Sequence, residues 1–201
     1  GIFSKLSYKH LNQDSDDIAV IMLTWKPYED NMEDFTKSSY YQNTLAVYNM
    51  LGKYLPADQI HIVIHPKTGA HLEKTELAPS IWRKPISEVL SIAKLLITDY
   101  SSVCYNSFYQ GGGVVFFQED LKFYEKENGK LIPKDDEYIG KRAFSLEELN
   151  TILEEGCRDG RIQLDVFRTE EFERRYRQIN EFSDGKNMER LCEKLKELGL
   201  I

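Results

Sequence analysis

The chain has 201 residues, with 33 acidic and 26 basic side chains and a formal net charge of −7. Hydrophobic residues make up 41% and charged residues 29%, which is typical of a folded globular domain and excludes a disordered or collagen-like chain. The acidic balance also argues against a general nucleic-acid-binding protein, which normally carries surplus lysine and arginine. The longest apolar run covers residues 18–23, far short of the roughly 20 residues that a transmembrane helix needs.

The cysteines are three, widely spaced and without a CxxC pair. We therefore expect no zinc or other metal site, and reduced thiols in a cytoplasmic protein. The chain begins with Gly1 and not with methionine, which suggests an excised piece whose active site is completed elsewhere. Residues 1–16 are interpreted as a polar lead-in segment, and residues 17–201 as a single domain.

Short apolar runs alternate with helical patterns through the first half of the chain. The predicted elements are a buried strand over 18–25, a loop over 28–38, a helix from Thr44 to about Leu55, a strand over 60–64, a short helix over 86–93 and a strand over 95–98. Asp99 is well placed to cap a helix that begins at Tyr100 or Ser101. The run of glycines at 111–113 stops that helix.

The second half continues with a strand and then with helices. The predicted elements are a strand over 114–117, a long loop over 119–140, a helix over 146–155 that starts with the capping box Ser145-x-x-Glu148, a helix capped by Thr169, and a last helix whose core stripe is Met188, Leu191, Leu195 and Leu198. Strands alternating with helices in this rhythm predict an α/β fold, a Rossmann-like doubly wound parallel sheet.

Polar clusters follow three of the predicted strands. They are Thr24-Trp25-Lys26, His65-Pro66-Lys67 and Asp99-Tyr100-Ser101-Ser102. In open parallel sheets, ligands bind in the crevice beyond the carboxyl ends of the strands, so these clusters are candidate binding groups. A fourth cluster, Asp184-Gly185-Lys186-Asn187, opens the last helix.

The serine pair has the chemistry of a phosphate site. Ser101 and Ser102 would add two hydroxyls to the free backbone N–H groups of a helix start, and His65 could donate to a phosphate oxygen. The plain alternatives are that Asp99 or Ser101 is only a helix cap and that His65 is an ordinary polar residue.

The fourth cluster leaves similar alternatives open. Lys186 and Arg190 lie one turn apart and could face a diphosphate together, or they could be solvated surface residues. Asp184 could contact a ribose or glycerol, or it could cap the last helix. The sequence contains no recognisable nucleophile–base arrangement, no GxGxxG and no GxxxxGK[ST].

The clusters in this order resemble the CDP-glycerol glycerophosphotransferase family of teichoic acid synthesis. The resemblance rests on Leu96-Ile97-Thr98-Asp99-Tyr100-Ser101-Ser102, Ile64-His65-Pro66, Leu23-Thr24-Trp25, Asp120-Leu121-x-x-Tyr124 and Asp184-Gly185-Lys186 with Arg190. It covers residues 17–200. Asn106 departs from the acidic residue that we expect in many relatives, which leaves the identity of the donor open.

The resemblance implies the C-terminal, donor-binding half of a GT-B architecture. It implies that Ser101 and Ser102 hold the donor phosphates and that His65 contacts the diphosphate. Thr24, Asp99, Asp184, Lys186 and Arg190 would line the same cleft. The general base would come from a missing N-terminal half, so this piece alone would be inactive.

The implied partners are CDP-glycerol or a related cytidine-activated donor, and a polymer or lipid-linked acceptor bound by the missing half. The reaction would release CMP, with no cofactor, in the cytoplasm, where the full-length protein would lie at the inner face of the cell membrane. Two alternatives remain open. One is a CMP-sugar-dependent, capsule or sialyl-type glycosyltransferase, and the other is a non-catalytic flavodoxin-like or receiver-like binding module.

Overall fold

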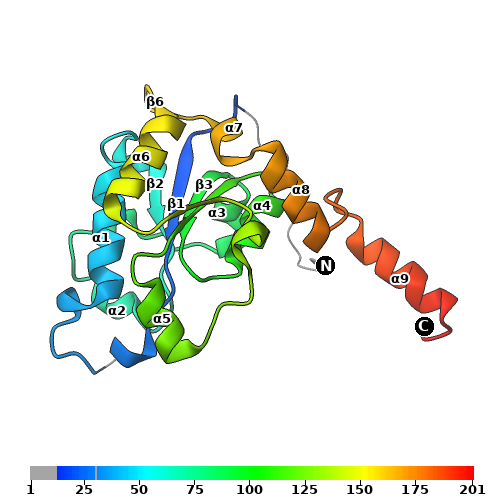
Figure 1. Ribbon diagram of the computed structural model, residues 1–201, viewed down its shortest axis with the longest axis horizontal. Helices are drawn as coiled ribbons and strands as arrows, with labels where there is room; N and C mark the ends of the chain where they lie inside the picture. The colour runs from blue at the N-terminus through cyan, green and yellow to red at the C-terminus, as the bar shows by residue number, and fades with distance from the viewer. Residues whose placement is uncertain (1–12, 30) are drawn as a thin grey trace.

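A five-stranded parallel sheet forms the centre of the computed structural model, which describes residues 13–29 and 31–201 (Figure 1). Its strands are β1 (Ile18–Met22), β2 (Ile60–Ile62), β3 (Ala93–Thr98), β4 (Gly113–Phe117) and β5 (Lys141–Ala143), in the spatial order β2-β1-β3-β4-β5. Val20 pairs with His61 on one side and with Leu96 on the other, so β1 is an interior strand. The predicted α/β, doubly wound parallel sheet is confirmed.

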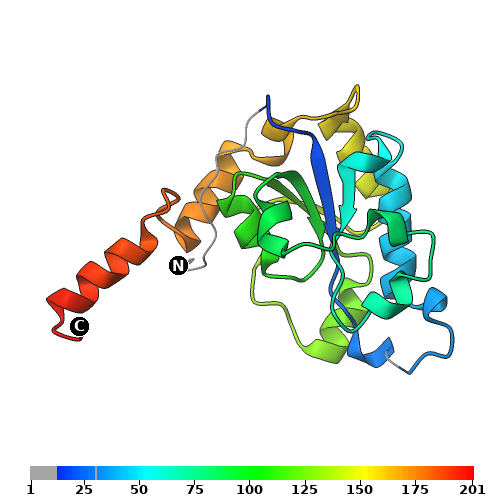
Figure 2. The same ribbon diagram turned by 180° about the vertical axis from the view of Figure 1, so that it is seen from behind.

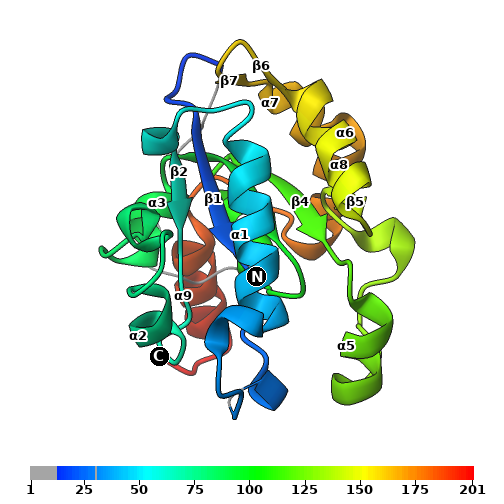
Figure 3. The ribbon, with the colours of Figure 1, turned by 90° about the vertical axis from the view of Figure 1, so that its left-hand side faces the viewer.

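Helices cover both faces of this sheet. The helices are α1 (Ser39–Leu51), α2 (Gly69–Leu72), α3 (Ile86–Leu90), α4 (Val103–Tyr109), α5 (Leu121–Asn128), α6 (Leu146–Gly156), α7 (Leu164–Phe167), α8 (Glu170–Ile179) and α9 (Asn187–Glu197). Figure 3 shows α1 in front of the sheet, with α6 beside it. α3, α4 and α8 pack on the other face, where they form two further apolar clusters.

Alternation along the strands builds the two cores. In β1, Ala19 and Ile21 pack with the α1 and α6 side, while Val20 joins the cluster on the opposite face. In β3, Leu95 and Leu96 divide between the two faces in the same way. A strand buried on both faces needs apolar residues at every position, which explains the continuous apolar runs in the sequence.

Side-chain caps fix where three helices begin. The Ser38 hydroxyl accepts a hydrogen bond from the Tyr41 N–H at 3.1 Å, so α1 starts at Ser39 and not at the predicted Thr44. Ser145 accepts from the Glu148 N–H at 3.1 Å, which confirms the predicted start of α6. Thr169 caps α8 as predicted.

Several predicted boundaries were wrong. β1 ends at Met22 and β2 at Ile62, although the Val63 N–H still donates to the Ile21 carbonyl at 2.9 Å. The predicted loop over 28–38 contains two short 3-10 helices, Pro27–Glu29 and Phe35–Lys37. The predicted loop over 119–140 contains α5 and another 3-10 helix, Asp135–Glu137.

Short strands were missed because they carry little hydrophobic signal. β5 is three residues long, and its central residue is Arg142. A two-stranded hairpin, β6 (Cys157–Arg158) with β7 (Arg161–Ile162), turns through Asp159 and Gly160, both at positive φ.

The predicted core stripe of the last helix was also wrong. Figures 1 and 2 show α9 extending away from the sheet. α9 is described throughout and has no buried residue; Met188 is 48% exposed and Leu198 is 59% exposed. Across residues 13–29 and 31–201, no helix has the length and hydropathy to cross a membrane.

A buried ion pair joins the amino-terminal edge of the sheet to the hairpin. Lys94 in β3 has a fully buried side chain whose Nζ lies 3.0 Å from Asp17 Oδ1 and donates to the Gln13 carbonyl at 3.0 Å. The same Asp17 oxygen accepts from the Ile162 N–H at 2.7 Å. Arg161 approaches Asp17 from the solvent side at 3.5 Å. The pair therefore ties the starts of β1 and β3 to β7.

The three thiols should differ sharply in reactivity. Cys104 and Cys157 are buried, and burial raises the pKa of each thiol to about 12, whereas Cys192 on α9 is exposed. Since the thiolate is the reacting species, we expect Cys192 to react with a thiol reagent in the native protein and the other two only after unfolding. Mass spectrometry of the labelled peptides checks this expectation, and rapid native labelling of Cys104 would contradict it.

Candidate functional site

The loops that follow β1, β2 and β3 meet at one edge of the sheet. The strands are parallel, so their carboxyl ends lie on the same edge, and β1 and β3 are neighbours although β2 lies between them in sequence. The order of the strands reverses between β1 and β3, which is where doubly wound sheets bind ligands. Thr24 and Asp99 stand on the two sides of this switch point.

The Asp99 carboxylate joins the two loops. It accepts from the Thr24 N–H at 2.9 and 3.0 Å, from the Thr24 hydroxyl at 2.6 Å and from the Tyr100 N–H at 2.6 Å. Asp99 is 5% exposed; burial raises the pKa of its carboxyl, and these hydrogen bonds act in the opposite direction. Asp99 does not cap α4, which starts at Val103, so the predicted cap was wrong. The Asp99 carboxylate therefore holds the loop after β1 against the loop after β3.

His65 belongs to the same edge through Trp25. The two rings are stacked with their centroids 5.2 Å apart and their planes 10° from parallel. The Lys67 ammonium lies 4.2 Å from the centre of the Trp25 ring. Because Thr24 bonds to Asp99 and Trp25 stacks on His65, the loop after β1 connects the imidazole to the loop that carries the serine pair.

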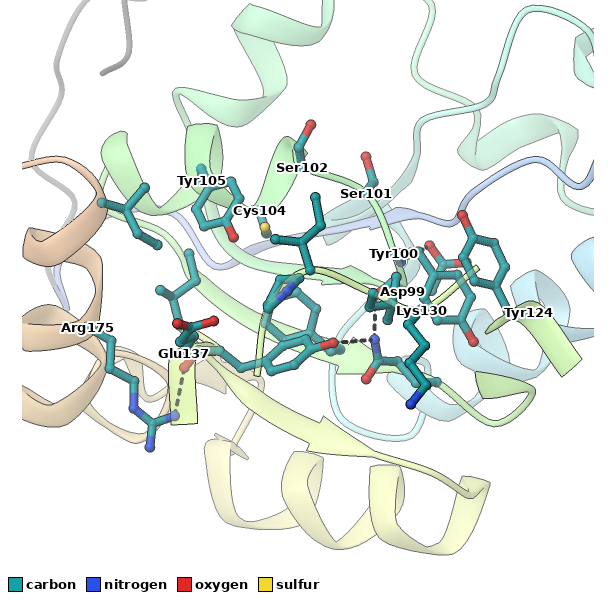
Figure 4. Close-up of a pocket in the computed structure, with 18 of the residues that line it drawn as sticks. Asp99, Tyr100, Ser101, Ser102, Cys104, Tyr105, Tyr124, Lys130, Glu137 and Arg175 are labelled. Carbon is teal, nitrogen blue, oxygen red and sulfur yellow. Dashed lines mark hydrogen bonds between the residues drawn. The ribbon is translucent and has the colours of Figure 1, made fainter. Parts of the chain in front are cut away.

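The serine pair lies immediately before α4. Ser102 is the residue that precedes the first helical position, and the Ser101 hydroxyl accepts from the Val103 N–H at 3.3 Å. The predicted helix start at Tyr100 or Ser101 is therefore two to three residues too early. In Figure 4 both hydroxyls point the same way, away from Lys130 and Glu137.

A cavity of about 640 Å³ opens beside the serine pair (Figure 4). Its walls come from the loop after β3, from α4, β4 and α8, and from α5 with the segment that follows it. The lining includes five aromatic side chains, Tyr100, Tyr105, Phe116, Tyr124 and Tyr138. Lys130, Glu137 and Arg175 add charge.

Gln118 holds the inner wall of this cavity in place. Its side-chain amide donates to the Asp99 carbonyl at 3.0 Å and to the Tyr138 hydroxyl at 3.4 Å. Its oxygen accepts from Arg142 Nε at 2.8 Å. Gln118 and Tyr138 were not predicted as site residues, because no motif marks them and Tyr138 lies in the segment predicted to be a loop.

The outer wall is attached through Asp120. The Asp120 carboxylate accepts from the Tyr100 hydroxyl at 2.7 Å and forms an ion pair with the buried Lys26. The Tyr100 ring stacks on Tyr124 of α5, with 3.6 Å between centroids. Lys26 also donates to the Ser39 hydroxyl at 2.8 Å, which links this wall to the start of α1.

The fourth predicted cluster pairs with itself. Arg190 donates to the Asp184 carboxylate at 2.8 and 2.6 Å, and the Lys186 N–H donates to the same carboxylate at 3.1 Å. The guanidinium of Arg190 holds the pKa of Asp184 well below its usual range. These residues lie in the connection from α8 to α9 and at the start of α9, outside the set of described residues that line the cavity. The structure thus brings Thr24, His65, Asp99 and the serine pair to one edge, and leaves this cluster as a separate group.

The described residues offer no cluster of metal ligands. Within residues 13–29 and 31–201, no group of three or more histidine, cysteine, aspartate or glutamate side chains is arranged to hold a metal ion. The polar groups at the edge are mostly hydroxyls, N–H groups and an imidazole, which suit an anion.

A family profile described as CDP-glycerol:poly(glycerophosphate) glycerophosphotransferase matches residues 5–197. A comparison with curated proteins found no significant match.

Solved structures of the wall teichoic acid polymerase TagF share the fold. One is 19% identical with a TM-score of 0.63, over 92% of this chain and 45% of that chain. A histidine-to-alanine variant gives 19% identity and a TM-score of 0.62, over 93% of this chain and 45% of that chain. A histidine-to-asparagine variant soaked with CDPG gives 18% and 0.58, over 92% of this chain and 42% of that chain. The chain thus spans less than half the length of these structures.

Proposed function

Because this chain belongs to the CDP-glycerol:poly(glycerophosphate) glycerophosphotransferase family, we propose that it is the donor-binding domain of a polyol-phosphate transferase. The donor is CDP-glycerol or CDP-ribitol, and the product is teichoic acid or a related cell-surface polymer. One observation carries this proposal: an aromatic cavity opens beside a serine pair at the switch point of a doubly wound sheet.

The cavity suits the nucleoside part of the donor. Small-molecule sites typically measure about 300–1,000 Å³ and are mainly apolar with a few polar groups. The volume of about 640 Å³ and the tyrosine-rich lining fit this description. Aromatic faces such as Tyr105 and Tyr138 offer stacking surfaces for a pyrimidine base.

The diphosphate then lies at the serine pair. Ser101 and Ser102 donate hydrogen bonds to its oxygens, and His65 reaches it from the loop after β2. Thr24 and Asp99 hold these loops in register through the hydrogen bonds between them. Lys186, Arg190 and Asp184 would join this site only after a rearrangement of the α8–α9 connection, since Asp184 now binds Arg190.

The reaction requires donors aimed at the leaving group. An acceptor hydroxyl attacks the phosphorus that carries the glycerol, and the bond from this phosphorus to the bridging oxygen breaks. CMP leaves with the bonding electron pair, so negative charge develops on its phosphate. Hydroxyl and imidazole donors placed there stabilise this charge without a general base in this domain.

The remaining parts of the transferase belong to the same proposal. A second domain facing this one in a GT-B arrangement supplies the acceptor site and the general base. The full enzyme works at the cytoplasmic side of the membrane, bound to its inner face. This chain alone binds the donor but does not transfer it.

Calorimetric titration of the chain tests this function. We expect saturable binding of CDP-glycerol, CDP-ribitol and CDP, and much weaker binding of UDP, which matches in charge but carries a different base. A clear preference for CMP-sialic acid over CDP-glycerol would instead favour a sialyl-type glycosyltransferase. Absence of binding to every cytidine nucleotide at millimolar concentration would favour a non-catalytic binding module and overturn the proposal.

A further inference from the structure

Lys26 is an almost fully buried lysine. It follows β1, is 2% exposed, and its ammonium donates to Ser39 and pairs with Asp120. A charge taken out of water is costly unless it is paired and hydrogen-bonded, so this ammonium depends on Asp120. The two residues are 94 positions apart in the sequence, and their contact connects the loop after β1 to the residue that precedes α5.

Asp120 also contacts Tyr100, a residue that lines the cavity. Its other carboxylate oxygen accepts from the Tyr100 hydroxyl at 2.7 Å. Burial and the Asp120 carboxylate raise the pKa of Tyr100, so its phenol stays protonated and continues to donate. The Tyr100 ring stacks on Tyr124, and both rings line the cavity. We call Lys26, Asp120, Tyr100 and Tyr124 the α5 contact cluster.

The α5 contact cluster is important because few other contacts hold α5 in place. α5 is described throughout and has no buried residue, and Figure 3 shows it at the periphery of the fold. Tyr28 contacts Phe123 edge-on at 5.2 Å, but both side chains are exposed. Segments with few buried apolar contacts open locally at low free energy. The position of α5, and of residues 128–133 that continue the cavity wall, therefore depends on a few polar and aromatic contacts.

We propose that Lys26 is a positioning residue for the donor site. Lys26 lies outside the set of described residues that line the cavity, and it acts through Asp120 to hold α5 and residues 128–133 as the outer wall. Holding this outer wall in position sets the affinity of the site for the nucleoside part of the donor. The identity of that ligand rests on the proposed function, whereas the control of α5 by Lys26 does not.

Amide hydrogen exchange of the chain without nucleotide tests the structural step. We expect Lys26→Met to raise the exchange rates of α5 amides at least tenfold, while those of β1 and β3 change much less. Tyr100→Phe, which removes one hydroxyl, should give a smaller effect in the same helix. Lys26→Arg keeps the charge and should restore most of the protection. Lys122→Met, at an exposed lysine of α5, is the matched control and should change nothing.

Calorimetric titration with CDP tests the binding step. We expect Lys26→Met to raise the dissociation constant about five- to tenfold and Lys26→Arg to restore it. Unchanged α5 exchange in both Lys26→Met and Tyr100→Phe would overturn the inference, and so would faster α5 exchange with unchanged CDP affinity. If the unaltered chain fails to bind CDP, the proposed function fails, and the exchange rates alone then decide whether Lys26 controls α5.

Discussion

Lys94→Met is expected to lower the free energy of unfolding by about 3–5 kcal/mol, the range found when one partner of a buried ion pair is removed. The methionine fills the space of the lysine stem, so the loss comes from Asp17, which keeps its buried position without its main cation. Asp17 would retain the Ile162 N–H and the more distant, half-exposed Arg161. Urea unfolding monitored by circular dichroism measures this change.

A surface pair provides the matched control. Lys141 pairs with Glu155 at 2.6 Å, but the carboxylate side chain is 54% exposed. Exposed pairs contribute about 0–1 kcal/mol, so Lys141→Met should change stability by no more than that. The double variant Lys94→Met with Asp17→Leu removes both buried charges and should recover part of the lost stability. Equal changes in the free energy of unfolding for Lys94→Met and Lys141→Met would show that the buried pair stabilises the fold no more than the exposed pair does.

Replacing Ser101 and Ser102 together by alanine is expected to weaken CDP binding about 100-fold. Each hydroxyl would donate to a charged phosphate, and such hydrogen bonds are worth about 1.5 kcal/mol or more apiece, so two amount to about 3 kcal/mol. Stability should change little, because Ser102 is exposed and makes no side-chain cap, and the half-exposed Ser101 loses only the long 3.3 Å hydrogen bond from the Val103 N–H. Calorimetric titration with CDP and thermal unfolding of the same samples separate the two effects.

Ser87→Ala is the control for this experiment. Ser87 is an exposed serine in the first turn of α3, outside the described residues that line the cavity. It should leave both affinity and stability unaltered. If the double serine variant binds CDP as tightly as the unaltered chain does, the diphosphate does not lie at Ser101 and Ser102.

The sequence predicted the central fold because the strands are buried on both faces. β1, β3 and β4 carry apolar residues at nearly every position, and that signal does not depend on distant contacts. β5 was missed since its arginine side chain points into a polar network with Gln118. The apolar stripe of α9 was predicted to lie in the core but is not buried. Helical periodicity indicates an amphipathic helix but does not show whether its apolar face is covered.

The placement of the candidate residues was predictable only where a residue follows a strand. Thr24, His65 and the serine pair were expected on one edge of the sheet because loops after parallel strands share that edge, and the structure places them there. The hydrogen bonds by which Asp99 connects two loops were not predicted, because local spacing favours a helix cap. Its partner, Thr24, lies 75 positions away in the sequence. Gln118, Tyr138 and the Lys26–Asp120 pair depend in the same way on contacts between distant segments, which spacing within one segment does not reveal.

The two tryptophans both rest against histidine rings. Trp25 stacks on His65, and Trp82 lies 5.0 Å from His61. An imidazole that takes up a proton quenches the fluorescence of an adjacent indole, so the emission of Trp82 beside His61 should decrease on acidification. Burial lowers the pKa of His61, which places the Trp82 change at a lower pH than for a free histidine. With Trp82 replaced by phenylalanine, Trp25 becomes an optical reporter at the edge of the sheet where the proposed donor site lies.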